Sequence, residues 1–261
     1  MKRLPFGILA LVLAAMVVPA QPAGSAERSV RVLFIGNSLT SANNLPAMVA
    51  DMARSRGHGL QYDIYAPGGY RLLQHAKDPK ALAKIRQGNW DFVVLQEHGQ
   101  CLGFSQAEIE VSVYPYVAQL DQAIKMASPK ATIVYYMTMA RKSGDLGHIS
   151  ISHELKTYAG TQHRVDKAYI DMARVFPAVL APVGLAWEDF RAQNPSIDLY
   201  ADEAHPNIKG SYLAACVIYE TLFKENSQGL PHPAGIDDMT AALIQNVTHH
   251  SSGRPVGILG K

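Results

Sequence analysis

The sequence has few cysteines and no recognisable pattern of metal ligands. Only Cys101 and Cys216 occur among its 261 residues. An exported chain could oxidise them to a disulfide, and two buried thiols would instead pack as small hydrophobic side chains; the sequence leaves both possibilities open. CxxC and HExxH motifs are absent, and His148 and His153 are five residues apart, a poor spacing for two ligands on one helical face. We expect no structural or catalytic metal.

Runs of basic residues are also missing. Lys and Arg together number 24 and Asp and Glu 22, which gives a formal net charge of +2. A nearly neutral chain without a basic cluster offers no electrostatic basis for binding nucleic acid, so we expect no nucleic-acid partner. Composition and charge leave the oligomeric state open.

Long hydrophobic runs are absent except near the N-terminus. Lys2 and Arg3 precede an apolar run at 8–18, and small residues lead up to Ala26. This pattern is typical of a secretory signal peptide spanning 1–26, and the run is shorter than the ~20 residues that cross a bilayer. A retained N-terminal anchor is the alternative. We expect a secreted or periplasmic protein with no stable membrane span after cleavage of the signal.

The rest of the chain alternates between two kinds of hydrophobic pattern. β-Branched and apolar segments predict strands at 29–36, 60–66, 90–96 and 131–139, with a short fifth strand within 178–183. Helical spacing predicts helices at 45–56, 71–87 with an interruption at Pro79, 105–127, 150–175 and 209–224.

Such alternation implies a parallel sheet with helices on both faces. We predict one α/β domain over 27–246, a three-layer α/β/α sandwich with about five strands, followed by a mobile or surface-draped tail at 247–261. Ligands of such sheets bind at the carboxyl ends of the strands. The loops after these strand ends are therefore where chemistry is expected.

The first candidate motif is Gly-Asn-Ser-Leu-Thr at 36–40, directly after the first predicted strand. Its serine, Ser38, would lie at the carboxyl edge of the sheet and near the start of a helix. Backbone N–H groups at such a turn can stabilise an oxyanion. A simple turn or helix cap is the alternative, because Asn and Ser favour both.

The second candidate motif places Asp202 three residues before His205. An aspartate at this spacing can hold the imidazole through Nδ1, which leaves Nε2 to take a proton from serine. Asp145 and His148 repeat the spacing, but that copy lies in a glycine-containing loop. The later copy is followed by Pro206 and precedes an apolar helix, so we favour it.

Together the two motifs resemble the GDSL/SGNH hydrolase superfamily. Residues 36–39 are similar to its first block, with Asn37 where Asp is usual, and residues 202–206 are similar to its last block. The resemblance extends over nearly all of the chain after residue 26. It implies a flavodoxin-like sandwich and a serine esterase that needs no cofactor. The catalytic residues that it implies are Ser38, Asp202 and His205.

The middle blocks of that family match less well. Its second block supplies an oxyanion glycine, for which Gly69 is the best candidate, with a plain turn as the alternative. Its third block, usually Gly-x-Asn-Asp, supplies an Asn donor, but residues 95–100 read LQEHGQ. Gln100 aligns with the Asn, and Gln96 lies at the predicted strand end. The expected oxyanion donors are the N–H groups of Ser38 and Gly69 and one of these two amides.

Three further residues lie near the expected site. Glu97 and His98 either contact substrate or form a solvated loop pair, and Trp187 either lines the pocket or belongs to the core. Export and family analogy favour acyl or acetyl esters of carbohydrates as substrates, followed by lipid esters. The alternatives are an acyltransferase with the same triad and a non-catalytic glycan-binding protein, which the missing Asn-Asp would favour.

Overall fold

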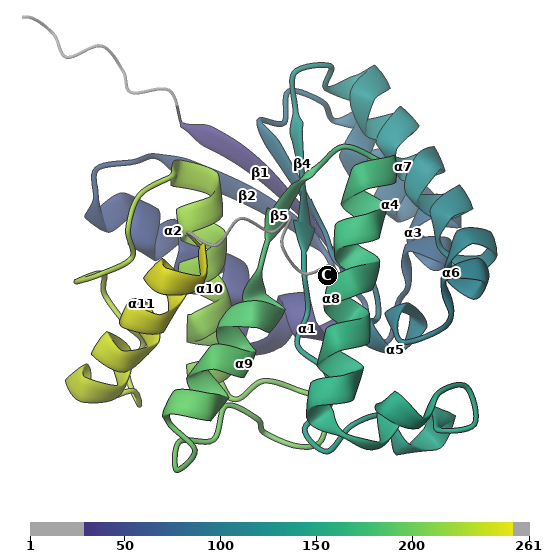
Figure 1. Ribbon diagram of the computed structural model, residues 1–261. Helices are drawn as coiled ribbons and strands as arrows, with labels where there is room; N and C mark the ends of the chain where they lie inside the picture. Colours follow the sequence, from purple (N-terminus) through teal and green to yellow (C-terminus); the bar gives the residue numbers. More distant parts are fainter. Residues whose placement is uncertain (1–28, 253–261) are drawn as a thin grey trace, which may run out of the picture.

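The computed structural model describes residues 29–252 and is built on a central parallel sheet (Figure 1). Its five strands are β1 (Val30–Ile35), β2 (Leu60–Tyr65), β3 (Phe92–Leu95), β4 (Thr132–Tyr136) and β5 (Val179–Ala181). They lie in the order β2-β1-β3-β4-β5, and every neighbouring pair is parallel. This order is the flavodoxin-like one, so the predicted fold class is confirmed. The predicted signal peptide lies outside the described residues.

Helices cover both faces of this sheet. Those of more than one turn are α2 (Leu45–Ser55), α3 (Leu72–Lys77), α4 (Pro79–Arg86), α6 (Gln106–Ser112), α7 (Tyr114–Ala127), α8 (Tyr158–Val175), α9 (Val183–Gln193), α10 (Ile208–Phe223) and α11 (Asp238–Ser252). Short turns of helix are α1 (Ser38–Ser41), η1 (Ala42–Asn44), α5 (Gly99–Leu102), η2 (Leu146–His148) and η3 (His153–Lys156). In Figure 1, α3, α4, α6 and α7 lie on one side of the sheet and α2, α10 and α11 on the other.

Two hydrophobic clusters, one on each face, follow from the two-residue period of the strands. In β1, Val32 and Phe34 belong to the cluster shared with α2, α9, α10 and α11. Leu33 and Ile35 point the other way, into the cluster shared with α3, α7 and α8. All four side chains are fully buried. A strand buried on both faces needs this continuous apolar sequence rather than an alternating one.

The cysteines divide between these two clusters. Cys216 lies on the α10 side of the sheet and Cys101 on the α7 side, and both are buried free thiols. The sheet between them excludes a bond, so of the two possibilities left open by the sequence, the structure has the buried thiols.

Two predicted helices are each divided in the structure. The 71–87 helix breaks at Asp78, whose extended backbone lets its carboxylate cap α4 through the N–H of Lys80. Pro79 then follows at the first position of α4, where its missing N–H costs nothing. The 105–127 helix breaks at Val113, and Pro115 is the second residue of α7, within the first turn where its missing N–H also costs nothing.

The predicted domain end at residue 246 is wrong. Helix α11 continues through that position, and Val247 and Thr248 are buried in it. Only residues 253–261 of the expected tail lie outside the described chain. Helix α9 was not predicted either, although it begins directly after β5.

Candidate active site

A tight turn after β1 carries Ser38 at the carboxyl edge of the sheet. The side chain of Asn37 caps this turn, because its Oδ1 accepts a hydrogen bond from the N–H of Leu39 at 3.1 Å. Gly36 cannot be replaced easily, since a Cβ there would lie 2.2 Å from Oγ1 of Thr40. The turn therefore needs glycine before the asparagine and projects Ser38 into a pocket.

Asn37 also connects this turn to the loop after β2. Its Nδ2 donates to the backbone oxygen of Tyr70 at 2.9 Å, and the side chain is almost completely buried. The loop contains Gly69, which has a φ of +71° that favours glycine and which lines the same pocket as Ser38. The amide of Asn37 thus ties the loop that contains Gly69 to the turn that carries Ser38.

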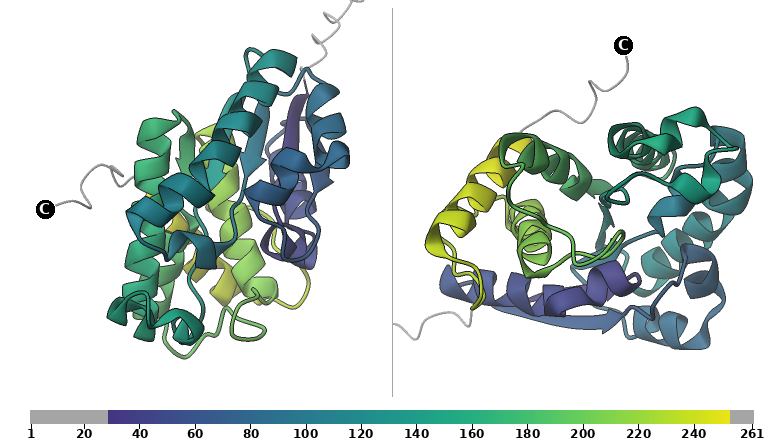
Figure 2. Two further views of the ribbon diagram at one scale, coloured as in Figure 1. Left: turned by 90° about the vertical axis from the view of Figure 1, so that its right-hand side faces the viewer. Right: turned by 90° about the horizontal axis from the view of Figure 1, so that it is seen from below.

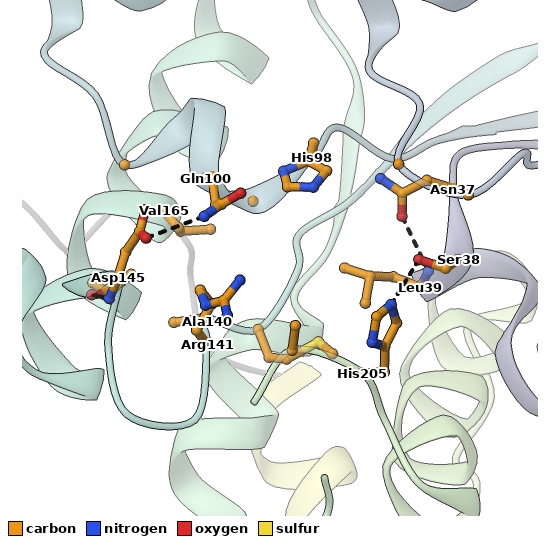
Figure 3. A pocket seen from close by; sticks show the side chains of 17 residues that line it. Asn37, Ser38, Leu39, His98, Gln100, Ala140, Arg141, Asp145, Val165 and His205 are labelled. Atoms are coloured by element: carbon orange, nitrogen blue, oxygen red, sulfur yellow. Dashed lines mark hydrogen bonds between the residues drawn. The ribbon is translucent and has the colours of Figure 1, made fainter. Parts of the chain in front are cut away.

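The loop before α10 brings Asp202 and His205 to Ser38 (Figure 3). Oγ of Ser38 and Nε2 of His205 are 3.1 Å apart. On the other side of the ring, Nδ1 of His205 lies 2.9 Å from Oδ2 of Asp202. This is the arrangement in which a carboxylate orients an imidazole toward a serine hydroxyl. His148, from the other Asp-x-x-His copy, pairs with Asp145 instead.

The carboxylate of Asp202 is stabilised in its charged form. The backbone N–H groups of Ala204 and His205 donate to Oδ1 at 2.7 and 2.8 Å. These bonds, followed by the contact with the ring of His205, lower the pKa of Asp202 to about 2. Asp202 therefore keeps its negative charge beside the imidazole at every pH near neutrality.

Asn43 joins the serine turn to the loop that carries His205. Its Nδ2 donates to the backbone oxygen of Pro206 at 3.1 Å and to Oγ of Ser211 at 2.9 Å. Its backbone has a φ of 51°, in the left-handed region that Asn tolerates better than most residues. The position of His205 relative to Ser38 therefore depends on a side chain that the sequence did not suggest.

Ser38 and His205 lie at the wall of a pocket of about 400 Å³. One part of its wall is formed by Ser38, Gly69 and His205. Another part is formed by Gln100 and Asp145. In Figure 3, Gln100 and Asp145 lie across the pocket from Ser38 and His205. A cavity of this size accommodates a small organic substrate.

No family model matches the sequence, and no curated protein matches it either. Solved structures do match. A DUF4886 family protein from Bacteroides uniformis has a TM-score of 0.72 and 17% identity, over 85% of this chain and 94% of that one. An acetyl xylan esterase has a TM-score of 0.57 and 14% identity, over 74% and 100% of the two chains. A GDSL-like lipase from Parabacteroides merdae has a TM-score of 0.53 and 11% identity, over 87% and 97%.

This chain has the GDSL/SGNH hydrolase fold. With identities this low the likeness concerns the fold alone, so the chemistry of this SGNH fold has to be argued from its own side chains.

The prediction of Gln96 as an oxyanion donor is wrong. Its side chain is fully buried beneath the serine turn. Oε1 accepts from the N–H of Asn37 and from Oγ1 of Thr40, both at 2.9 Å, and Nε2 donates to the backbone oxygen of Glu97 at 2.7 Å. Gln96 supports the turn that carries Ser38 from below and does not face the pocket.

Gln100 lines the pocket but does not face Ser38. Its Nε2 donates to Oδ1 of Asp145 at 3.2 Å, on the far wall in Figure 3. The structure therefore places neither predicted amide where the third oxyanion donor was expected.

Glu97 and Trp187 do not line the pocket, so the alternative in which they contact substrate is wrong for both. Trp187 belongs to the core, which was its other alternative, whereas Glu97 is buried and not the solvated loop residue that its other alternative required. The carboxylate of Glu97 is 1% exposed and accepts from the N–H groups of His98 and Leu72. Burial raises its pKa to about 7. Trp187 is 0% exposed and packs edge-on against Tyr200 in the core.

His98 does line the pocket. Burial lowers the pKa of its imidazole, and the nearby cations Arg71 and Arg141 lower it further. The ring is therefore neutral at neutral pH and carries one N–H that can donate. In Figure 3 its ring lies between Gln100 and Asn37.

Arg141 is a pocket residue that the sequence analysis missed. It follows the fourth strand at the carboxyl edge of the sheet, which is the signal that could have identified it. Between residues 29 and 252, no group of three or more His, Cys, Asp or Glu side chains could hold a metal ion. In that same part of the chain, every helix is too short or too polar to cross a bilayer.

Proposed function

We propose that this protein is an exported serine esterase that hydrolyses carboxylic esters, with acyl or acetyl esters of carbohydrates as its substrates. The observation that carries the proposal is the continuous contact from Asp202 through His205 to Ser38 at the wall of a pocket. A serine hydroxyl needs such a base to become a nucleophile at neutral pH.

In the proposed mechanism, Oγ of Ser38 attacks the ester carbonyl while Nε2 of His205 accepts its proton. The ionised Asp202 stabilises the imidazolium that forms. The N–H groups of Ser38 and Gly69 hold the oxyanion, and the neutral ring of His98 supplies a third donor in place of the two glutamines. His205 then protonates the leaving alcohol, and water releases the acid from the acyl-enzyme.

Exposure of the acid–base pair favours hydrolysis over acyl transfer. The side chains of His205 and Asp202 are 45% and 59% exposed, so water reaches the base without a conformational change. The carbohydrate part of the proposal is supported by the similarity to the acetyl xylan esterase and by the expected export.

The test is hydrolysis of short-chain p-nitrophenyl esters by residues 27–261 and by three alanine variants. We expect Ser38→Ala and His205→Ala to lower kcat by at least about 10³-fold. His148→Ala is the matched control, because it removes the histidine of the other Asp-x-x-His motif, and it should retain activity within a few-fold. Loss of activity in His148→Ala but not in His205→Ala would show that the base is His148 and that the proposed assignment to His205 is wrong.

A folded parent protein that cleaves none of these esters would contradict the general esterase. Adding acceptor alcohols to the same assay separates hydrolysis from transfer. Diversion of most of the acyl group to the alcohol would favour the acyltransferase, and an unchanged yield of free acid supports the hydrolase.

A further inference from the structure

Arg141 is a cation in the pocket that has no acidic partner among residues 29–252. It lies on the pocket wall, and in Figure 3 its guanidinium points into the space between Asp145 and His205. No hydrogen bond or ion pair joins that guanidinium to another group of residues 29–252. By contrast Lys142, the next residue, pairs with Asp198 at 2.6 Å.

The backbone on both sides of Arg141 is held in place independently of its side chain. Before it, the N–H of Ala140 donates to Oε1 of Gln162, and the oxygen of Ala140 accepts from the hydroxyl of Tyr200, both at 2.6 Å. After it, the N–H of Lys142 donates to the oxygen of Glu203 at 2.9 Å. The guanidinium is therefore presented by a fixed loop and needs no structural partner.

The charges around Arg141 leave it available to an anion. Asp145 is the carboxylate of this pocket, but its two oxygens accept from Gln100 at 3.2 Å and from His148 at 2.9 Å. The neighbouring His98 is kept neutral by burial and by cations, as described above. A carboxylate in a ligand would meet a planar guanidinium that can donate two parallel hydrogen bonds.

The side of the substrate that Arg141 faces follows from the loop next to it. The bond from Lys142 to Glu203 places this loop beside the loop that carries His205. In the proposed mechanism His205 returns its proton to the leaving alcohol, so the alcohol part of the ester lies on that side of the pocket.

We propose that Arg141 binds a carboxylate on the alcohol part of the ester, so that the preferred substrates are esters of acidic sugars such as O-acetylated uronic acids. This inference rests on the proposed esterase function. It goes beyond that function by naming a specificity-determining residue and the charge that it recognises.

The first test compares two substrates that differ only at C6, O-acetyl glucuronic acid and O-acetyl glucose. We expect the parent protein to show a kcat/KM for acetate release that is at least about tenfold higher for the acidic sugar. Arg141→Gln should reduce this ratio to about one. Arg141→Lys should keep part of it, because the charge remains without the two-pronged geometry. Arg174→Gln, at an exposed arginine near the end of α8, is the matched control and should keep the whole ratio.

A second measurement does not depend on turnover. Binding of glucuronate and of glucose is followed by NMR titration of the parent protein and of Arg141→Gln. We expect glucuronate to bind more tightly than glucose, and the difference to disappear in Arg141→Gln. Glucuronate binding of this kind without ester cleavage would contradict the esterase, and with it the assignment to an ester, and would leave Arg141 as a carboxylate-binding residue only.

Ester cleavage with equal kcat/KM values for the two sugars, and no preference for glucuronate, would overturn the inference and leave the esterase standing. A third substrate pair tests the side of the ester. If p-nitrophenyl hemisuccinate is preferred over p-nitrophenyl butyrate and Arg141→Gln removes that preference, the anion belongs to the acyl part and the assignment to the alcohol is wrong.

Discussion

Asn37 uses both ends of its side-chain amide, which explains why this chain has asparagine before Ser38. The oxygen accepts from the N–H of Leu39, and the nitrogen donates to the oxygen of Tyr70. An aspartate could make the first contact, but its second oxygen would face a carbonyl at hydrogen-bond distance with no proton between them. The loop that carries Gly69 therefore needs an N–H donor at position 37, which asparagine has and aspartate lacks.

This gives a prediction for Asn37→Asp, which restores the residue that is usual in the family. We expect it to destabilise the protein by about 1–3 kcal/mol, because a buried acceptor loses its donor. We also expect a lower kcat, because the loop with Gly69 is displaced from Ser38. Urea denaturation and ester hydrolysis measure the two effects.

Asn226→Asp makes the same chemical change at an exposed site and should leave both the stability and kcat unchanged. An Asn37→Asp protein as stable and active as the parent would refute this account.

His98 gives a second prediction at the same scale. If its neutral ring is the third oxyanion donor, His98→Ala should lower kcat by about 10²–10³-fold with a much smaller change in KM. His98→Gln keeps an N–H donor and should recover part of the loss. Steady-state kinetics with a short-chain ester gives both constants. A His98→Ala protein with kcat within twofold of the parent would show that two backbone donors suffice.

The sequence predicted the neighbourhood of Ser38 well and the side chains after β3 poorly. Ser38 follows β1 and His205 precedes α10, and both boundaries were evident in the sequence, so their meeting at one edge of the sheet could be expected. Gln96 and Glu97 directly follow β3, where consecutive side chains point in opposite directions. Their directions depend on where the strand ends and on what packs beneath the turn, and one sequence does not contain that information.

At the scale of elements, α10 shows what the sequence could have indicated and did not. Its residues from Gly210 to Leu222 are all buried. A helix that is apolar all round must be covered all round, so further helices had to lie beside it. Figure 2 shows α10 enclosed by α2, α9 and α11, which are also its neighbours in contact. The need to cover α10 could therefore have indicated that further helices exist at α9 and α11. The weak hydrophobic periodicity of those two segments did not by itself predict them.

The turn that carries Ser38 and the loop that carries His205 are far apart in the sequence, and Asn43 links them. Asn43→Gly keeps a residue suited to a φ of 51° and removes only the hydrogen bonds to Pro206 and Ser211. We expect it to lower kcat by roughly ten- to a hundredfold through displacement of His205. Asn43→Ala adds backbone strain and should in addition lower the free energy of unfolding.

Measuring the kinetics and the urea denaturation of both variants separates the effect of the lost hydrogen bonds from the effect of backbone strain at residue 43. If Asn43→Gly has the kcat of the parent, the side chain does not position His205. If both variants lose stability equally, strain at this residue is unimportant.

For the whole molecule, two buried carboxyl groups make folding depend on pH. Glu97 lies behind the pocket, and burial raises its pKa to about 7. Asp166 lies beneath α9 and accepts from Nε2 of Gln162 at 2.7 Å, and burial raises its pKa to about 8. Both groups hold a proton more tightly in the folded chain than in the unfolded chain. Their stabilising contribution is therefore fully present below their unfolded pKa values near 4 and is lost as the pH rises through the folded values.

We expect Glu97→Gln and Asp166→Asn each to remove part of this dependence. Between about pH 5 and pH 7, each group makes the free energy of unfolding fall by up to about 1.4 kcal/mol per pH unit. Buried His75 acts in the opposite direction, because burial lowers the pKa of its imidazole.

The quantity to measure is consequently the difference in the free energy of unfolding between parent and variant, obtained by urea denaturation at several pH values. That difference should change steadily in favour of the variant as the pH rises from 5 to 8, whereas Asp51→Asn, at an exposed carboxylate, should give a constant difference. A constant difference for Glu97→Gln as well would mean that water reaches this carboxyl, and that the wall behind His98 is less closed than the structure has it.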